Sequence, residues 1–248
     1  MGPAIEITGV TKRFGRKVAV DRLSLTIPRG ELFAFLGPNG AGKTTTIKMI
    51  CGLLRPHEGE VRVCGHPMGS DGLAAKALLA YVPDQPFLYD KLTAREFLCF
   101  VAEMYGLSRA ERDERMAELN AQLVLGSFID QMTESFSHGM KQRLVLAAAL
   151  LHDPQILVVD EPMVGLDPRT VRTVKDLFVR RAREGRTIFM STHTLEVAEA
   201  VADRIGIIDH GRLLAVGTIG ELKQRATGSA TLEDVFLRLT EEGDEQPV

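Results

Sequence analysis

The 248-residue sequence has no tryptophan, no closely spaced cysteine pair and no long apolar run. Its longest uninterrupted apolar stretch, residues 144–151, is far below the roughly 20 residues that a membrane-spanning helix needs. Near the N-terminus Glu6, Lys12 and Arg13 interrupt the apolar residues, which argues against a signal peptide. The sequence therefore predicts neither a membrane-spanning helix nor secretion.

The few cysteines and the small net charge exclude further classes of protein. Cys51, Cys64 and Cys99 are odd in number and widely spaced, so neither a disulfide framework nor a zinc site is indicated. We expect all three to pack structurally in a reducing cytosol, because nothing nearby marks an activated thiolate. The net charge of −3 provides no overall attraction to nucleic acid, so no nucleic-acid partner is expected.

The first quarter of the chain carries short β-rich segments, and the rest mixes helical and strand-like patterns. Segments 5–10, 18–27, 31–36 and 61–64 predict a mixed or antiparallel sheet. The middle third, about residues 93–151, reads as helical. Within it Thr93 with Glu96, and Ser108 with Glu111, match capping boxes that mark helix starts.

Strands and helices alternate beyond residue 155, which implies a parallel sheet covered by helices. An α/β fold with a parallel-sheet core and an antiparallel β-rich N-terminal part is therefore predicted. The acidic tail, residues 241–248, is expected to be disordered. The expected elements are strands 156–160 and 187–191, helices 171–183 and 195–202, a hairpin over 204–216 and a helix capped by Thr218 with Glu221.

The strongest local signal is GPNGAGKT, residues 37–44, which matches the phosphate-binding P-loop pattern GxxxxGK[ST]. A buried strand precedes it and a helical pattern over 43–53 follows, so an ordinary glycine turn is the weaker alternative. Lys43 is expected to reach the β- and γ-phosphates, and Thr44 to offer its hydroxyl to Mg²⁺. The candidate phosphate-binding residues are Gly37, Pro38, Asn39, Gly40, Ala41, Gly42, Lys43, Thr44 and Thr45.

A second motif, ILVVDE at residues 156–161, is an apolar strand that ends in two acids. In α/β folds ligands bind beyond the carboxyl ends of the strands, so Asp160 and Glu161 are expected beside the phosphates. Asp160 would hold Mg²⁺, and Glu161 would polarise the water that attacks ATP. The alternative is that both are solvated charges at a strand end.

With these motifs, the chain from about Ile5 to Thr240 resembles the ATP-binding cassette (ABC) ATPases. Its segment 232–240, LEDVFLRLT, is similar to the end of prokaryotic exporter subunits whose membrane proteins are separate chains. The resemblance implies one P-loop ATPase domain over residues 1–240, with a helical subdomain at about 88–152 and ATP and Mg²⁺ as cofactors. It also implies transmembrane permease partners, a homodimer or a heterodimer with a paralogue, and a cytoplasmic location on the inner face of the cell membrane.

The segment FSHGM, residues 136–140, stands where the family has its signature loop LSGGQ. Ser137 and Gly139 agree with that pattern, whereas His138 and Met140 depart from it. The resemblance implies that Ser137 and Gly139 contact the γ-phosphate of ATP bound to the opposite subunit. Considered without the family, Ser137 is a helix N-cap, and both roles are compatible.

Three more single residues gain a role from the resemblance. Phe14 stands where the family stacks an aromatic ring on adenine, with core packing as an equal alternative. Asp167 ends a segment that resembles the D-loop of the dimer interface, and a helix cap is its alternative. His193 matches the switch histidine that contacts the γ-phosphate and is expected to act with Glu161 and Lys43 in catalysis.

The Q-loop region departs from the family pattern. Asp84 follows Tyr81-Val82-Pro83 where the family has glutamine, and Gln85 comes one position later. The family's glutamine has a magnesium or a coupling role, so Asp84 is a candidate Mg²⁺ ligand beside Thr44 and Asp160, with coupling as the alternative. The aromatic segment 86–89 comes next, where the family docks its membrane partner. Docking and core burial remain equal alternatives for that segment.

One function from a different class remains open, namely a soluble ATPase of the same superfamily that acts on nucleic acid or ribosomes. The segment between Lys43 and Asp160 is too short for the long coiled coil of the chromosome-maintenance relatives. Translation-type members usually carry two cassettes, and one is present here. A nucleotide-binding regulator without hydrolysis is disfavoured by Glu161.

Overall fold

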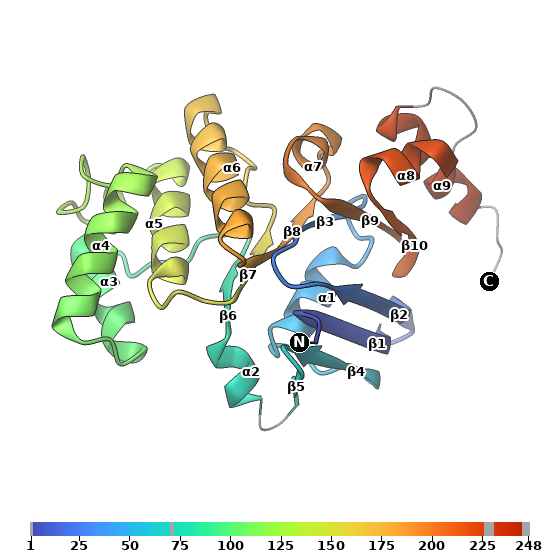
Figure 1. Cartoon of the computed structure of the whole chain (residues 1–248), viewed down its shortest axis with the longest axis horizontal. Helices are drawn as coiled ribbons and strands as arrows, with labels where there is room; N and C mark the ends of the chain where they lie inside the picture. The colour runs from blue at the N-terminus through green and yellow to red at the C-terminus, as the bar shows by residue number, and fades with distance from the viewer. Residues whose placement is uncertain (1, 70–71, 226–230, 245–248) are drawn as a thin grey trace.

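The computed structural model describes residues 2–69, 72–225 and 231–244, and its strands form two sheets (Figure 1). The first sheet is antiparallel and runs in the order β2-β1-β4-β5. Three of the four predicted N-terminal segments belong to it, whereas segment 31–36 forms β3 of the second sheet. The second has the order β10-β9-β3-β8-β7-β6 and is parallel except for the β9–β10 hairpin. The strands are β1 (Ile5–Phe14), β2 (Lys17–Ile27), β3 (Leu32–Leu36), β4 (Glu58–Val63), β5 (His66–Pro67), β6 (Leu79–Val82), β7 (Ile156–Asp160), β8 (Thr187–Thr192), β9 (Arg204–Asp209) and β10 (Arg212–Gly217).

The helices begin where the sequence places their caps. Both capping boxes form, at Thr93 with Glu96 and at Ser108 with Glu111, and they open α3 and α4. No helix in the described ranges is both long and apolar enough to cross a membrane. The helices are α1 (Lys43–Ile50), α2 (Leu73–Ala77), α3 (Ala94–Met104), α4 (Arg109–Leu123), the short 3₁₀ helix η1 (Thr133–Ser135), α5 (His138–Leu150), α6 (Pro168–Arg183), α7 (Leu195–Val201), α8 (Ile219–Arg225) and α9 (Leu232–Asp244).

The C-terminal end corrects one prediction. Helix α9 continues to Asp244, so residues 241–244 are helical where disorder was expected. Glutamate is a good helix former, and an acidic composition alone does not end an amphipathic helix. Residues 245–248 of the predicted tail lie outside the described residues.

Strand β3 separates two hydrophobic cores. Its Leu32, Ala34 and Leu36 pack on the side of α5, α6 and α7, and Phe33 and Phe35 pack on the side of α1 and the antiparallel sheet. A strand buried on both faces reads as a continuous apolar run, which is how the sequence predicts it. All three cysteines are free thiols, Cys51 buried and the other two half-buried, in agreement with a packing role.

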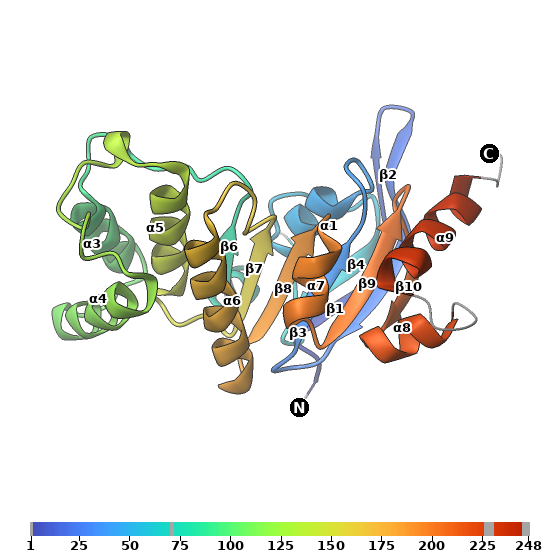
Figure 2. The ribbon, with the colours of Figure 1, turned by 90° about the horizontal axis from the view of Figure 1, so that it is seen from above.

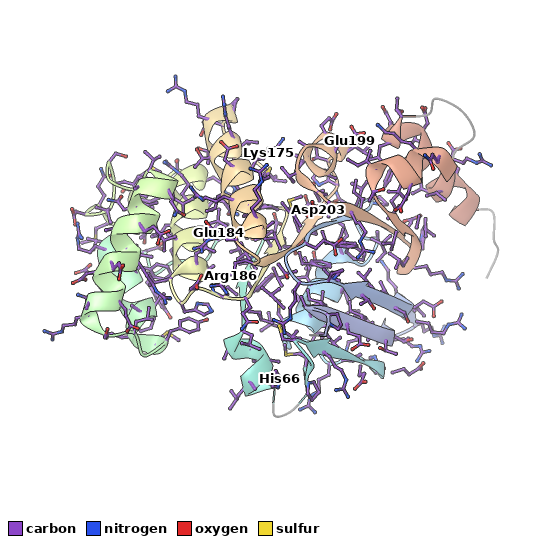
Figure 3. The ribbon with its side chains drawn as sticks, in the orientation of Figure 1. His66, Lys175, Glu184, Arg186, Glu199 and Asp203 are labelled. Atoms are coloured by element: carbon purple, nitrogen blue, oxygen red, sulfur yellow. The ribbon has the colours of Figure 1, made fainter. Side chains whose placement is uncertain are left out.

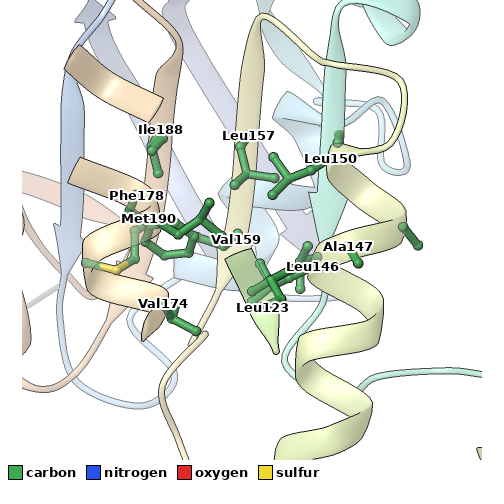
Figure 4. Close-up of a cluster of buried hydrophobic side chains, with 14 of the residues drawn as sticks. Leu123, Leu146, Ala147, Leu150, Leu157, Val159, Val174, Phe178, Ile188 and Met190 are labelled. Carbon is green, nitrogen blue, oxygen red and sulfur yellow. The ribbon is translucent and has the colours of Figure 1, made fainter. Parts of the chain in front are cut away.

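Helices α3, α4 and α5 lie between β6 and β7 in the chain and at the opposite end of the molecule from α8 and α9 (Figures 1 and 2). Figure 4 shows how this helical part joins the sheet, with Leu150 of α5 beside Leu157 of β7 and Leu146 of α5 beside Leu123 of α4. Phe178 of α6 extends the same cluster. The helical subdomain at 88–152 agrees with this order of elements, and its boundaries stay a prediction.

Candidate functional site

The loop between β3 and α1 is so tightly enclosed that two of its glycines have no substitute. A Cβ on Gly37 would lie 2.3 Å from the carbonyl oxygen of Ile208. Gly42 has a φ of +108°, and its Cβ would lie 2.6 Å from the carbonyl oxygen of Ala19. Only glycine tolerates the close approach at both positions and the left-handed backbone at Gly42, which explains these positions of the GxxxxGK[ST] pattern.

The same loop is hydrogen-bonded to the turn between β9 and β10. Gly211 N donates to the carbonyl of Ala41 over 2.9 Å. The carbonyl of Gly211 in turn accepts from Asp21 N of β2, also over 2.9 Å. The phosphate loop is therefore held between elements of both sheets, and its backbone amides are fixed before a ligand arrives.

Lys43, the first residue of α1, is largely buried, with 6% of its side chain exposed. Its Nζ donates to the carbonyl oxygens of Gly37 at 2.7 Å and Pro38 at 3.2 Å. The same Nζ lies 3.4 Å from Oε1 of Glu161. The ammonium thus stays above the loop, where the phosphates of a nucleotide would replace some of these partners.

Glu161 follows the end of β7 in a left-handed conformation, with a φ of +48° that is uncommon for a residue with a side chain. Its N–H donates to the carbonyl and to Oγ of Ser191 on β8. Its Oε2 lies 2.9 Å from Nδ1 of His193. Both carboxylate oxygens are buried without a hydrogen-bond partner of good geometry in the described part of the chain, so each keeps its capacity to accept one.

Asp160 is buried at the end of β7 and is tied to the next strand. Its Oδ1 accepts the hydroxyl hydrogen bond of Ser191. Its Oδ2 is buried without a hydrogen-bond partner among the described residues. A buried carboxylate oxygen without a partner is costly unless an ion or ligand binds it, which suits the predicted Mg²⁺ ligand.

A cavity of about 340 Å³ brings the separate motifs together. Phe14 lies at its wall with 53% of its surface exposed, so it is not a core residue. Lys12 Nζ lies 5.7 Å from the centre of that ring. An exposed aromatic face at the phosphate cavity favours the adenine-stacking alternative. The cavity is lined by Phe14, Lys17, Ala19, Asn39, Gly40, Gly42, Lys43, Thr44, Thr45, Asp84 and Glu161.

Asp84 also lines this cavity, and its surroundings favour its protonated form. Partial burial raises its pKa, and the negative charges of Asp160 and Glu161 raise it further. Positive charge on His138 or His193 acts in the opposite direction. Carboxylates that repel one another in this way fit a shared cation, because a metal ion offsets the repulsion.

The signature-loop residues do not line the cavity formed by the P-loop of their own chain. Ser137 caps α5 and accepts a hydrogen bond from Met140 N at 3.3 Å, as its alternative interpretation predicts. A Cβ on Gly139 would lie 3.8 Å from Leu166 Cδ2, so this loop lies against the predicted D-loop.

Asp167 serves as a helix cap in this chain. It accepts hydrogen bonds from Arg169 N, Thr170 N and the Thr170 hydroxyl. The bonds from Thr170 are the main cause that lowers the pKa of Asp167 below its usual value. The capping alternative is therefore confirmed, and contact of Asp167 with nucleotide stays a prediction.

Ser191 is a site residue that the sequence reasoning missed. It binds the side chain of Asp160 and the backbone of Glu161, so it holds both acids at the edge of the sheet. Its position follows from the pairing of β7 with β8, in which Asp160 lies opposite Ser191. The available signal was the pair of polar residues, Ser191 and Thr192, that follows the apolar residues of the strand.

The aromatic segment after Asp84 divides between surface and core. Phe87 is 77% exposed and contacts the ring of Tyr89 at 5.9 Å between centroids. Tyr89 is half-exposed and also contacts Phe97 and Phe100 of α3. Phe87 therefore favours the docking alternative, and Tyr89 joins that surface to the core.

Comparison with protein families gives two matches along the chain. The family model described as ABC transporter matches residues 20–164, which is more than half of the sequence. A second model, described as AAA domain, putative AbiEii toxin, Type IV TA system, matches residues 130–199. The first match spans the P-loop, the signature segment and both acids at the end of β7.

Individual proteins agree with the family match. The linearmycin resistance ATP-binding protein of Bacillus subtilis is 38% identical over 96% of this chain and 75% of its own length. The Nod factor export ATP-binding protein I of Sinorhizobium fredii is 39% identical over 93% of this chain and 67% of its own length.

Solved structures confirm the P-loop fold. The ATP-binding subunit of an ABC transporter superimposes with a TM-score of 0.89 and 32% identity, over 95% of this chain and 99% of that one. A dimeric ATP-binding cassette in a post-hydrolysis state with ADP and phosphate superimposes with a TM-score of 0.79 and 27% identity, over 86% of this chain and 98% of that one. The chain belongs to the ABC transporter family, as an ATP-binding subunit that hydrolyses ATP.

Proposed function

We propose that this subunit drives export through separate transmembrane proteins, and that it works as a dimer on the cytoplasmic face of the membrane. The catalytic part rests on one observation, the carboxylate of Glu161 between Lys43 and His193 with both oxygens able to accept a hydrogen bond. The direction of transport rests on relatives named for drug resistance and Nod factor export.

Thr44, Asp160 and Asp84 are the residues we propose to hold Mg²⁺. The unpartnered Oδ2 of Asp160 and the raised pKa of Asp84 both fit a cation at this place. Mg²⁺ is usually bound through one or two carboxylates together with phosphate oxygens, so a small protein ligand set suffices. When bound, the ion would neutralise charge that develops on the phosphates.

In the hydrolytic step Glu161 would accept a proton from the attacking water, because it is the carboxylate with free acceptor positions beside Lys43. Lys43 would stabilise the negative charge on the γ-phosphate. His193, whose Nδ1 lies 2.9 Å from Oε2 of Glu161, would donate to a phosphate oxygen.

Dimerisation would complete each site, since Ser137 and Gly139 lie outside the cavity of their own P-loop. Ser137 and the N-terminus of α5 would contact the γ-phosphate of ATP bound to the other subunit, with Asp167 and the D-loop at the interface. Dimeric ABC cassettes among the similar structures support this arrangement. The partner is a second copy of the chain or a paralogue.

The permease would dock at the aromatic surface formed by Phe87, Tyr89 and Phe100, which is exposed beside α3. Purification of the tagged chain from detergent-solubilised membranes tests the proposal. A transmembrane protein should co-purify, and the complex should hydrolyse ATP in the presence of Mg²⁺. Recovery with ribosomes or nucleic acid, and with no membrane protein, would instead favour the soluble alternative.

A further inference from the structure

His138, the first residue of α5, is hydrogen-bonded to the loop that follows Glu161. Its Nε2 lies 3.1 Å from the carbonyl oxygen of Val164. A carbonyl oxygen only accepts, so this ring nitrogen carries the proton and donates. The first turn of α5 is therefore joined by a side chain to residues 162–166, which are distant in the sequence.

A second contact accompanies the hydrogen bond. Gly165 has a φ of +71°, and a Cβ built on it would lie 3.2 Å from Cδ2 of His138. The imidazole thus lies against a residue that has no side chain. Gly139 is similarly close to Leu166, at 3.8 Å from its built Cβ. Two successive residues of α5 contact the same loop.

This loop begins at Glu161 and is compact. Val164 N donates to the carbonyl of Glu161 at 3.3 Å. The left-handed backbone of Glu161 is an unfavourable conformation for a glutamate, and neighbouring structure has to maintain it. The N–H of Glu161 donates to Ser191. The carbonyl of Glu161 accepts from Val164 N, and the carbonyl of Val164 in turn accepts from His138. A displacement of Val164 would therefore reach the catalytic carboxylate.

We propose that His138 is a positioning residue for Glu161. Its ring joins the Ser137 turn to the loop after Glu161, so the two segments move together. The inference rests on the proposed dimer, in which Ser137 meets the ATP of the other subunit, and it deepens that function. ATP contact at one site would set the carboxylate of the other. The family pattern LSGGQ has glycine at the position of His138, and a glycine has no side chain that could bond to Val164.

The test compares His138→Ala, which removes the ring, with His138→Gln, whose amide can donate from a similar position. His66→Ala is the matched control, at an exposed histidine in β5 (Figure 3). Hydrogen exchange of the backbone amides of residues 161–166 should become about threefold faster or more in His138→Ala, because an exposed hydrogen bond contributes modestly. His138→Gln and His66→Ala should exchange as the wild type does.

Steady-state kinetics give the functional result. In His138→Ala kcat should fall by about threefold or more with KM for ATP unchanged, and His138→Gln should restore most of it. Unchanged exchange in residues 161–166 would overturn the inference. So would a loss confined to KM, which would assign His138 to nucleotide binding. A wild-type protein that does not hydrolyse ATP would instead contradict the proposed function, and the exchange result would still decide on the link.

Discussion

The Nζ atom of Lys43 lies 3.4 Å from Oε1 of Glu161, and both side chains are largely buried. The residue proposed to bind phosphate and the residue proposed to activate water are thus paired in the structure without nucleotide. A phosphate that attracts Lys43 weakens this pairing and leaves Glu161 beside the incoming water. If Glu161 is the base, we therefore expect ATP binding to free it for the hydrolysis of that ATP.

The first prediction concerns Glu161→Gln. Glutamine keeps the shape of the side chain and removes its basicity, so ATP should still bind with Mg²⁺ while turnover falls by about 10²–10⁴-fold. Phosphate release and binding of a fluorescent ATP analogue measure the two properties. Equal hydrolysis by the wild type and the variant would remove Glu161 from the role of base.

Mixing two inactive variants tests the composite site. Lys43→Ala should abolish activity by removing a cation from the phosphates, and Ser137→Arg by blocking the approach of the signature loop. In a mixed dimer one site collects both changes, and the other combines an intact Lys43 with an intact Ser137. ATPase activity should therefore reappear when subunits exchange.

Tagged pull-down shows whether mixed dimers have formed. Mixed dimers without activity would count against the composite site. A chain that does not pair with itself would point to a paralogue, and the same two substitutions then belong in that natural pair.

Replacement of Phe87 and Tyr89 by serine tests the docking surface. Membrane association should weaken, because two exposed aromatic rings are removed from it. Phe87→Ser should leave the melting temperature within about 2 °C, and Tyr89→Ser should lower it more, since Tyr89 contacts Phe97 and Phe100. Leu73→Ser, at an exposed leucine of α2, is the control, and an equal loss of association in that variant would contradict a specific surface.

The raised pKa of Asp84 predicts that the stability of the nucleotide-free protein depends on pH. Its pKa is raised above its ordinary value of 3.8, chiefly by burial and then by Asp160 and Glu161. The folded protein therefore binds this proton more tightly than the unfolded chain, and stability is lost as pH rises from 3.8 through the folded pKa.

Asp84→Asn should remove that loss, because asparagine stays neutral. Its melting temperature should exceed that of the wild type by roughly 1–2 °C at pH 7, a small gain because Asp84 is exposed in part, and the gain should disappear below the ordinary pKa. Thermal denaturation between pH 3 and pH 8 measures it. Asp90→Asn is the control at an exposed aspartate outside the cavity, and a variant no more stable than the wild type at pH 7 would contradict the prediction.

Local chemistry explains which parts of the fold the sequence predicts well. Thr93 and Ser108 cap α3 and α4 as expected, because a capping box lies within four successive residues. The order of the strands in the sheet, in contrast, depends on residues that are far apart in the sequence. β3 lies between β8 and β9, which follow it by most of the chain, and only the packing of the connecting helices selects these neighbours.

The same distinction holds for the site. Lys43, Asp160 and Glu161 were predicted because each belongs to a short motif with a defined chemical role. The hydrogen bonds of Ser191 depend on strand register, and the hydrogen bond of His138 joins α5 to the loop after Glu161. Neither contact can be recognised from a short stretch of sequence. Contacts that Ser137 makes with the other subunit stay predictions.

Strand β3, which precedes the phosphate loop, is synthesised long before the strands that pair with it. Both of its partners, β8 and β9, and the turn that holds Ala41, are translated long after it. Domains generally fold as units while the ribosome adds residues from the N-terminus, so a nascent chain that already contains the whole motif still lacks what encloses it. Until residue 211 has emerged, β3 lacks both of its neighbouring strands and the loop lacks the turn that holds Ala41.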